Sequence, residues 1–450
     1  MGNSGRFSYS FDDRYFAEFA YGFNGSEKFT GNKRYGFFPS FGAGWMISNE
    51  KFWEKFAPAV NMLKLRGTWG IVGNDAIAGR SGRFFYLSDI SLGGAGYTWG
   101  STFNNEFGGY TTNRYANPNI TWEQSEKINL GFELGLFNSA LKIEGDFFKD
   151  YRSKIYMSRQ NFPSTAGLEA AISGNVGKVN SQGFDGMVEF NKTFSPNYWL
   201  SLRGNFTYAT NKYVALDEKD YPDEYLKRIG TNINQPRGLI AERLFVDEHE
   251  IANSPKQDFG EYLAGDIKYM DVNSDGLINN NDYVPIGHPT VPEIQYGFGA
   301  SMGYKAVDFS FFFQGNARTS FFINAGDEGI APFVDHRNAL SIIANDYWSE
   351  TNPNIHAFWP RLSTNAIANN TRNSSWWLRD GSFLRLKSVE LGYSPKGLER
   401  FGIRKGSRIY LSSQNVLVLS SFKLWDPEMG SKGLGYPPNR RFNLGFQLIF

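Results

Sequence analysis

The sequence predicts an all-β fold, an antiparallel transmembrane β-barrel, from three observations. Phe, Tyr and Trp make up 17% of the 450 residues, and 49 residues are glycine. Aromatic residues favour strands, and glycine suits tight turns and crowded sheet positions. Mean hydropathy is −0.42, and no apolar run approaches the roughly 18 residues of a membrane helix. Long segments instead alternate between apolar and polar residues, which is how barrel strands cross a membrane.

Charge and cysteine content exclude several classes of function. The net charge is +1, from 46 basic and 45 acidic residues, so no basic excess points to nucleic acid. There is no cysteine, which excludes disulfides, thiolate metal sites and cysteine catalysis.

Alternation is clearest in residues 294–304 and 307–314, and it recurs in 63–71, 128–136 and 200–208. These segments exceed the roughly 5–6 residues usual for soluble strands, and the template gives about fourteen or fifteen strands in all. The residues predicted to face lipid are Ile294, Tyr296, Phe298, Phe309, Phe311 and Phe446. Those predicted to face the lumen are Gln295, Asp308, Gln314 and Gln447.

The expected connections alternate in length. Short turns are predicted at 12–13, 138–139, 195–197 and 305–306, and long irregular connections at 73–119, 213–236, 246–292 and 315–377. Short turns on one side and long loops on the other are typical of outer-membrane barrels. Residues 49–58 predict one short amphipathic helix (Phe52, Trp53, Phe56) over the barrel rim. The alternation shifts phase near Lys387 and Ser388, which indicates a bulge or a misplaced boundary.

The two ends of the chain carry different signals. Residues 442–450 place five apolar residues on one face and finish on Phe450. This resembles the C-terminal signal by which outer-membrane barrels are assembled; the alternative is the last strand of a soluble sheet. Residues 1–6 lack the basic and apolar regions of a signal peptide. Either the protein is not secreted or the chain is a fragment, and the strand pattern favours a fragment.

A collinear set of short motifs carries a family resemblance. Gly265–Tyr269 reads GDIKY and leads into DVNSDG (271–276), VPIGHP (284–289), NPN (352–354), WPRL (359–362), WLRDGSFLRLK (377–387), WDPE (425–428) and YPP (436–438). In this order and spacing they resemble the SusC/RagA family of TonB-dependent outer-membrane transporters. The resemblance covers essentially the whole chain.

The resemblance implies a 22-stranded barrel filled by an N-terminal plug domain and covered by a SusD-type surface lipoprotein. It also implies energy from TonB, import of oligosaccharides or peptides, and no enzymatic activity. Residues 1–450 match only the C-terminal portion of such a barrel, without the plug domain, TonB box or signal peptide. Transport is therefore expected of the parent protein in the outer membrane of a Gram-negative bacterium, and not of this chain acting alone.

One segment predicts a structural calcium site. Residues 271–282 match a 12-residue calcium loop, with Gly276 at the sharp turn and Ile278 at the apolar position. The predicted ligands, at loop positions 1, 3, 5, 7, 9 and 12, are Asp271, Asn273, Asp275, Leu277 (through its carbonyl), Asn279 and Asp282. Asp282 stands where Glu is usual, so bidentate binding is expected to be weak. The alternative is an Asx-rich turn without an ion.

No catalytic set emerges. The four histidines are expected to be loop residues: His249, His288, His336 and His356. Trp376 and Trp377 are interpreted as part of an aromatic belt at the membrane interface in preference to a sugar-stacking platform. Four charged residues are predicted to face the lumen, as a structural network in preference to solute contacts: Arg203, Arg379, Arg385 and Glu133.

Two further functions stay open at this point. One is a passive porin-like or purely structural barrel, which a plug domain and TonB box encoded upstream would exclude. The other is a secreted, calcium-bearing β-rich carbohydrate-binding module, which would need no detergent for extraction.

Overall fold

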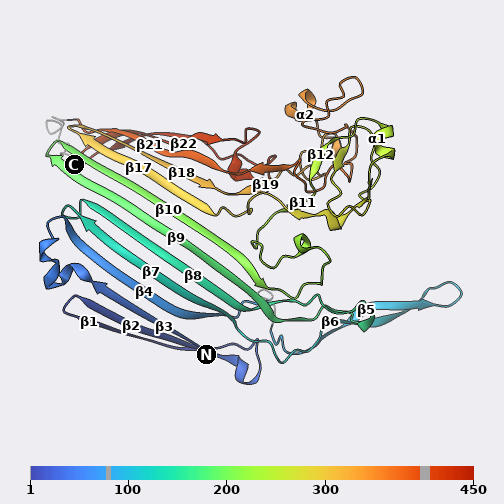
Figure 1. Cartoon of the computed structure of the whole chain (residues 1–450), viewed down its shortest axis with the longest axis horizontal. Helices are drawn as coiled ribbons and strands as arrows, with labels where there is room; N and C mark the ends of the chain where they lie inside the picture. The colour runs from blue at the N-terminus through green and yellow to red at the C-terminus, as the bar shows by residue number, and fades with distance from the viewer. Residues whose placement is uncertain (1, 78–82, 396–405, 450) are drawn as a thin grey trace. The chain divides into compact units, whose positions relative to one another are not determined.

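The computed structural model describes residues 2–77, 83–395 and 406–449. Within them, 13 strands form one sheet whose hydrogen-bonded order follows the chain (Figure 1). The predicted antiparallel fold class is confirmed. The strands of the sheet are β1 (Gly2–Phe11), β2 (Tyr15–Gly25), β3 (Tyr35–Met46), β4 (Val60–Asn74), β7 (Glu123–Leu136), β8 (Leu141–Ser158), β9 (Ser173–Ser195), β10 (Tyr198–Ala215), β17 (Ile294–Tyr304), β18 (Val307–Ala317), β21 (Phe383–Tyr393), β22 (Arg408–Ser420) and β23 (Arg441–Gln447).

Shorter strands pair with one another inside the connections. The pairs are β5 (Asp89–Trp99) with β6 (Asn105–Arg114), β11 (Arg237–Gly238) with β16 (Val284–Pro285), β12 (Ala241–Leu244) with β14 (Ile267–Tyr269), β13 (Lys256–Gln257) with β15 (Leu277–Ile278), and β19 (Ser320–Phe322) with β20 (Leu378–Asp380). The described helices are α1 (Glu248–Ala252), α2 (Ser341–Asn345) and the 3-10 turns η1 (Gly31–Arg34), η2 (Ile47–Asn49), η3 (Lys51–Lys55), η4 (Ser164–Ala166), η5 (Glu224–Leu226), η6 (Asn280–Asp282), η7 (Val334–His336) and η9 (Pro427–Met429). No helix of the described residues is long and apolar enough to span a membrane.

The chain divides into two compact units. The first comprises Met1–Met187, Ala209–Tyr221 and Lys227–Asn232, and the second comprises Val188–Tyr208, Pro222–Leu226 and Ile233–Phe450. The first holds β1 to β8, and the second holds β17 to β23.

The two faces of the sheet differ in chemistry, as the alternation predicts. In the first unit, Phe19 stacks on Phe7 and lies against Phe41, with ring centroids 6.4 and 4.8 Å apart, and Phe41 stacks on Trp69 at 5.9 Å. Arg6, one residue from Phe7, pairs instead with Glu18 on the other face. An exposed aromatic row on one face and ion pairs on the other suit lipid and a watery lumen respectively.

The second unit also has aromatic side chains on one face of its strands and charged side chains on the other. Phe298 stacks on Phe313 at 5.3 Å, and Phe311 lies 5.8 Å from Phe313. On the opposite face, Asp308 pairs with Arg408. The predicted assignment of faces therefore agrees with the partners that these side chains have.

Short turns occur where the sequence predicts them. Asp12 and Asp13 join β1 to β2 with φ of 53° and 49°, and Lys305 of the β17–β18 turn has φ of 57°. Such left-handed residues match the twist of tight hairpins. The turns of residues 137–140 and 196–197 join β7 to β8 and β9 to β10.

The long connections contain more structure than predicted. Between β4 and β7, β5 and β6 form a hairpin that projects past the ends of β7 and β8 in Figure 1. The predicted connections 213–236 and 246–292 are parts of one connection, 216–293, because β11 and β12 pair within it and not with the sheet. The large sheet thus has 13 strands in the described residues, where the alternation template gives about fourteen or fifteen.

Two local predictions have different outcomes. The phase shift is a β-bulge: the β21–β22 pairing skips Lys387 between Leu386 and Ser388. Of the helix predicted at 49–58, the structure forms the 3-10 turn η3 (Lys51–Lys55), and one continuous helix is wrong because Glu50 is extended (φ −79°, ψ 143°) and separates η2 from η3. The indole of Trp53 donates to the Val60 carbonyl at 2.9 Å, while Phe52 and Phe56 stay exposed.

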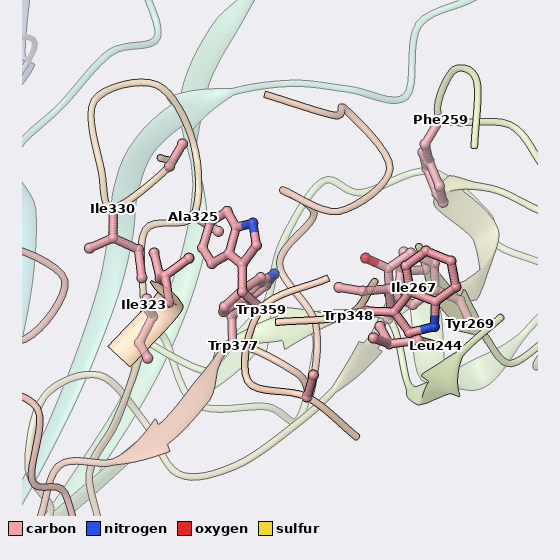
Figure 2. Packing of buried hydrophobic residues seen from close by; sticks show 14 of the residues in the cluster. Leu244, Phe259, Ile267, Tyr269, Ile323, Ala325, Ile330, Trp348, Trp359 and Trp377 are labelled. Carbon is pink, nitrogen blue, oxygen red and sulfur yellow. The ribbon is translucent and has the colours of Figure 1, made fainter. Parts of the chain in front are cut away.

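The second unit has a hydrophobic core of its own outside the sheet. We call the packed segments 233–293, 318–382 and 421–430 the loop body. Its core joins all three connections, and Figure 2 shows Trp359 and Trp377 side by side near Ile323 and Ala325. Trp377 is only 1% exposed and its ring lies 5.2 Å from that of Trp359. Both interpretations of Trp376 and Trp377 are therefore wrong: the two indoles donate to the carbonyls of Phe358 and Asn370 inside the loop body.

Candidate functional site

The predicted calcium loop is a compact turn closed by its own backbone. Both carboxylate oxygens of Asp271 accept N–H bonds, from Asp275 at 3.3 Å and Gly276 at 2.8 Å. Asp275 accepts from the Leu277 N–H at 2.8 Å and from the side-chain amide of Asn273 at 2.9 Å. Gly276 has φ of 83°, a left-handed conformation that glycine adopts without a steric cost. The sharp turn predicted at Gly276 is confirmed.

Asp282, at the last position of the loop, lies apart from solvent. Its side chain is fully buried and accepts N–H bonds from Val272 and Asn279, both at 2.8 Å, while Asn279 caps η6 in return. In the described part of the chain, no three Asp, Glu or His side chains form a group that could hold a metal ion. The donor set is oxygen-rich, as calcium prefers, but hydrogen bonds hold these oxygens. Calcium binding stays a prediction.

Two of the predicted lumen residues, Glu133 and Arg385, belong to ion-pair networks, whereas Arg379 lies in the loop body and bonds to backbone carbonyls there. Glu133 of β7 lies 3.2 Å from the Lys64 amine and 3.3 Å from Arg66 of β4, and Arg66 reaches Asp146 of β8 at 2.5 Å. These contacts tie three neighbouring strands together. Arg379 donates to the carbonyls of Trp376 and Leu378, and burial lowers the pKa of its guanidinium.

Arg385 is the centre of a buried ion-pair cluster. It is 2% exposed, and its Nη2 donates to both oxygens of Asp426, at 2.6 and 2.8 Å, and lies 2.7 Å from Glu428. Asp426 also caps η9 by accepting the Glu428 N–H at 3.0 Å. The cluster fixes the β22–β23 connection to the sheet. Arg203 is different: its guanidinium lies 4.6 Å from the centre of the Phe312 ring.

The loop body carries one strongly perturbed carboxylate. Burial opposes ionisation of Glu250, but hydrogen bonds from Arg243, the Val246 N–H and Lys268 outweigh it and lower its pKa to about 2. The Arg243 and Lys268 nitrogens lie 2.6 and 3.0 Å from the Glu250 carboxylate. The interaction joins α1 to β12 and β14.

The four histidines lie in connections, as predicted. His249 is in α1, His336 is in η7, and His288 and His356 are in irregular segments.

A hollow of about 270 Å³ lies on the polar face of β10, β17 and β18. Asn205 lies opposite Gly297, which lies opposite Gln314. In the next row, Gln295 lies opposite Asn316. We call this the amide hollow; its lining includes Asn205, Gln295, Gln314, Asn316, Phe312 and Glu428.

The four amide side chains of the hollow have no hydrogen-bond partner among residues 2–77, 83–395 and 406–449, and Oδ1 of Asn316 is buried as well. Sequence analysis placed Gln295 and Gln314 on the lumen face but did not join them to Asn205 and Asn316. Only the register of the three strands brings these four residues together, and the sequence alone does not specify that register.

A second hollow, of about 460 Å³, lies on β1 to β4 of the first unit. Its charged side chains are already paired, Arg6 with Glu18 and Lys64 and Arg66 with Glu133. It therefore offers few free polar groups.

Comparisons with known proteins agree with the fold. No protein-family model matches the chain. It is 28% identical to TonB-dependent receptor P26 of Formosa agariphila, a match that covers 99% of this chain and 46% of that protein. It is 25% identical to TonB-dependent receptor SusC of Bacteroides thetaiotaomicron, covering 99% of this chain and 43% of SusC. The chain thus spans somewhat less than half the length of the curated relatives it matches.

Solved structures give the same architecture. The RagAB peptide transporter aligns with a TM-score of 0.73 over 99% of this chain and 47% of that chain, at 20% identity. The "open-open" state of the RagAB peptide importer aligns with a TM-score of 0.74 over 100% of this chain and 46% of that chain. At this identity the likeness concerns the fold.

Together, these findings define a class. A sheet of long strands with one aromatic and one polar face, matched over nearly its whole length to TonB-dependent receptors, is part of a β-barrel in the outer membrane of a Gram-negative bacterium. Within that class, the predicted resemblance to the C-terminal barrel portion of the SusC/RagA family is confirmed. The relatives are named as receptors and transporters, which is consistent with a protein that is not an enzyme.

Proposed function

We propose that the protein carrying this chain imports a nutrient, an oligosaccharide or a peptide, across the outer membrane in a TonB-dependent manner. In this proposal, the chain supplies part of the barrel wall and the extracellular connections. The observation that carries it is the match over 99% of the chain to receptors named TonB-dependent. A polar sheet face with paired charges and free amides supports it, since such a face suits a watery solute path.

Uptake by the native host is the direct test. Deleting the full-length gene should abolish uptake of one labelled oligosaccharide or peptide, and deleting TonB should abolish it equally. Uptake that survives loss of TonB would favour a passive, porin-like barrel. Recovery of the protein from the medium without detergent would favour the secreted module.

We propose further that a SusD-type surface lipoprotein covers the extracellular side. The support is the β5–β6 hairpin, whose apolar side chains Leu92, Tyr97 and Tyr110 are each about three-quarters exposed. Exposed apolar clusters of this kind mark interaction sites.

Replacing Tyr97, Phe107 and Tyr110 by serine should reduce the amount of a SusD-type lipoprotein of the native host that copurifies with the full-length protein. Aromatic anchors dominate such interfaces. Tyr436→Ser, at an equally exposed tyrosine in another connection, is the control and should leave copurification unchanged. Equal copurification of both variants would remove the hairpin from the interface.

A further inference from the structure

We infer that the connection between β3 and β4, residues 47–59, is an anchor in the headgroup region of the periplasmic leaflet of the outer membrane. Phe52 and Phe56 insert among the lipid chains, so the occupant of this apolar surface is phospholipid. The inference rests on the barrel class of the protein and does not depend on the proposed import function. We call residues 47–59 the rim segment.

The rim segment lies at the edge of the sheet where the turns are short. Figure 1 shows it in blue at the same end as the turns between β1 and β2 and between β7 and β8. The side-chain amide of Asn49 donates to the Asp13 carbonyl of the first turn at 2.8 Å. The N–H of Phe137, in the second turn, donates to the Ala59 carbonyl at 3.1 Å. Since short turns of outer-membrane barrels face the periplasm, the rim segment faces it too.

Glu50 ties the start of the rim segment to the lipid-facing side of the sheet. Its carboxylate accepts from the Tyr15 hydroxyl at 2.5 Å and from the Trp45 indole at 3.0 Å. Tyr15 and Trp45 are cross-strand partners whose ring centroids lie 6.4 Å apart. They stand on the same face as Phe19 and Phe41, further along the same two strands, because strand side chains alternate between faces. The segment therefore begins against the aromatic row that faces lipid.

Trp53 ties the end of the rim segment to the same side. Its indole donates to the Val60 carbonyl at 2.9 Å, and the Val60 N–H donates to the Phe56 carbonyl at 2.8 Å. Val60 lies opposite Leu136 beside a bulge of β4. Leu136 belongs to the alternating apolar set of residues 128–136. Both ends of the segment thus continue the face that is in contact with hydrocarbon.

The side chains of η3 separate by chemistry. Side chains three residues apart eclipse one another in a 3-10 helix, so Lys51 and Glu54 share one line. Trp53 and Phe56, which directly follows the helix, share another. The Trp53 ring lies 5.3 Å from that of Phe56 and 6.5 Å from that of Phe52. The three rings form one continuous apolar patch beside a polar line.

Exposure and charge favour lipid as the occupant of this patch. Phe52 and Phe56 are 59% and 57% exposed, and exposed apolar clusters mark interaction sites. Aromatic rings gather at membrane interfaces, where lysines extend their charged ends toward the headgroups. Lys51 and Lys55, both exposed, flank the rings and match anionic phospholipids. A periplasmic protein on the same rings would have to displace lipid from the adjoining aromatic row.

The test is the lipid contact of a nitroxide spin label on the full-length protein in liposomes of phosphatidylethanolamine and phosphatidylglycerol. Phe52→Cys and Phe56→Cys carry the label in separate variants. This chain has no cysteine, and any elsewhere in the full-length protein is first replaced by serine. Oxygen collects in hydrocarbon and a polar nickel chelate stays in water, so the ratio of their collision rates with the label measures lipid contact. At both positions this ratio should be several times higher than at Glu54→Cys, the matched control on the polar line of η3.

Glu50 is a positioning residue in this account, and a second measurement tests it. With the label at Phe52→Cys, adding Glu50→Ala should lower the collision ratio and make the nitroxide more mobile. The reason is that the carboxylate that accepts from Tyr15 and Trp45 is lost. An unchanged ratio and mobility would contradict the part assigned to Glu50.

Two results would overturn the inference. Ratios at both labelled phenylalanines as low as at Glu54→Cys would show that the rim segment stands in water. Labels shielded from both reagents would show that protein covers the patch. Because Phe52 and Phe56 are both exposed, their replacement leaves no cavity, and if one variant fails to assemble the other decides. These results leave TonB-dependent import untouched, since uptake in the host measures it separately.

Discussion

At the scale of single residues, the position of a side chain on the sheet decides whether it meets lipid or water. Phe298 stacks on Phe313 at 5.3 Å, while Asp308 accepts from Nε of Arg408 at 3.0 Å on the opposite face. Alternation in the sequence was enough to separate these two sets, because side chains of a strand alternate strictly between its faces. Their individual partners could not be predicted, since partners depend on register.

Phe311→Arg should destabilise the assembled full-length barrel by about 2–4 kcal/mol, the cost of a charge at a mid-membrane lipid position. Gln314→Arg on the same strand should cost much less, because Gln314 lies on the polar face. Unfolding titrations in lipid would measure both free energies. Equal destabilisation by the two variants would show that the faces are assigned wrongly.

A second prediction at the scale of residues concerns calcium binding by the loop of residues 271–282. Calcium should bind weakly, in the 10⁻⁴–10⁻³ M range typical of extracellular modules, because the short side chain of Asp282 is already held by the N–H groups of Val272 and Asn279. Calorimetric titration of calcium into the full-length protein measures this.

The double variant Asp271→Ala/Asp275→Ala should abolish calcium binding and loosen the loop while the barrel stays assembled. Its control is Asp258→Ala, at an acidic residue outside the loop. An absence of binding at millimolar calcium would leave an Asx-rich turn closed by its own backbone.

At the scale of elements, local features could be predicted and long-range ones could not. The turns at Asp12–Asp13 and at Lys305, and the bulge at Lys387, depend on a few adjacent residues, and the sequence carries their signal. The core of the loop body joins Leu239, Trp377 and Phe422 from three separate connections. No local pattern links such distant residues, so Trp377 was misread as a residue of the membrane interface.

The interaction of α1 with β12 and β14 should weaken in acid. Because the pKa of Glu250 is lowered from 4.5 to about 2, its ionised form stabilises the folded loop body fully above pH 4.5. This stabilisation is lost as the pH falls from there toward 2. Hydrogen exchange of residues 241–252 in the full-length protein, corrected for the intrinsic pH dependence, should show falling protection over this range.

Glu250→Gln serves as the comparison, since it keeps the size of the side chain and removes the titrating group. Its protection should be lower at pH 5 and should change less between pH 5 and 2.5. The same pH dependence in both proteins would show that Glu250 does not control this part of the loop body.

At the scale of the whole molecule, the sheet has two strands with a neighbour on one side only. In the described residues, β1 pairs only with β2, and β23 pairs only with β22. Barrels span membranes because closure satisfies every backbone N–H and C=O group, and an open edge in hydrocarbon leaves them unpaired. The chain spans somewhat less than half the length of the curated relatives it matches.

This chain expressed by itself should therefore not transport. Its free edges should lead to aggregates or to oligomers that pair edge to edge, because an exposed strand edge is a template for further pairing. The exposed aromatic row of β1 to β4 adds apolar surface that favours association. Size-exclusion chromatography with light scattering would report the oligomeric state in detergent, and solute uptake into liposomes would report transport.

The full-length protein, prepared in the same way, is the control and should give discrete particles. A monodisperse monomer of residues 1–450 that imports solute would contradict this account of the sheet.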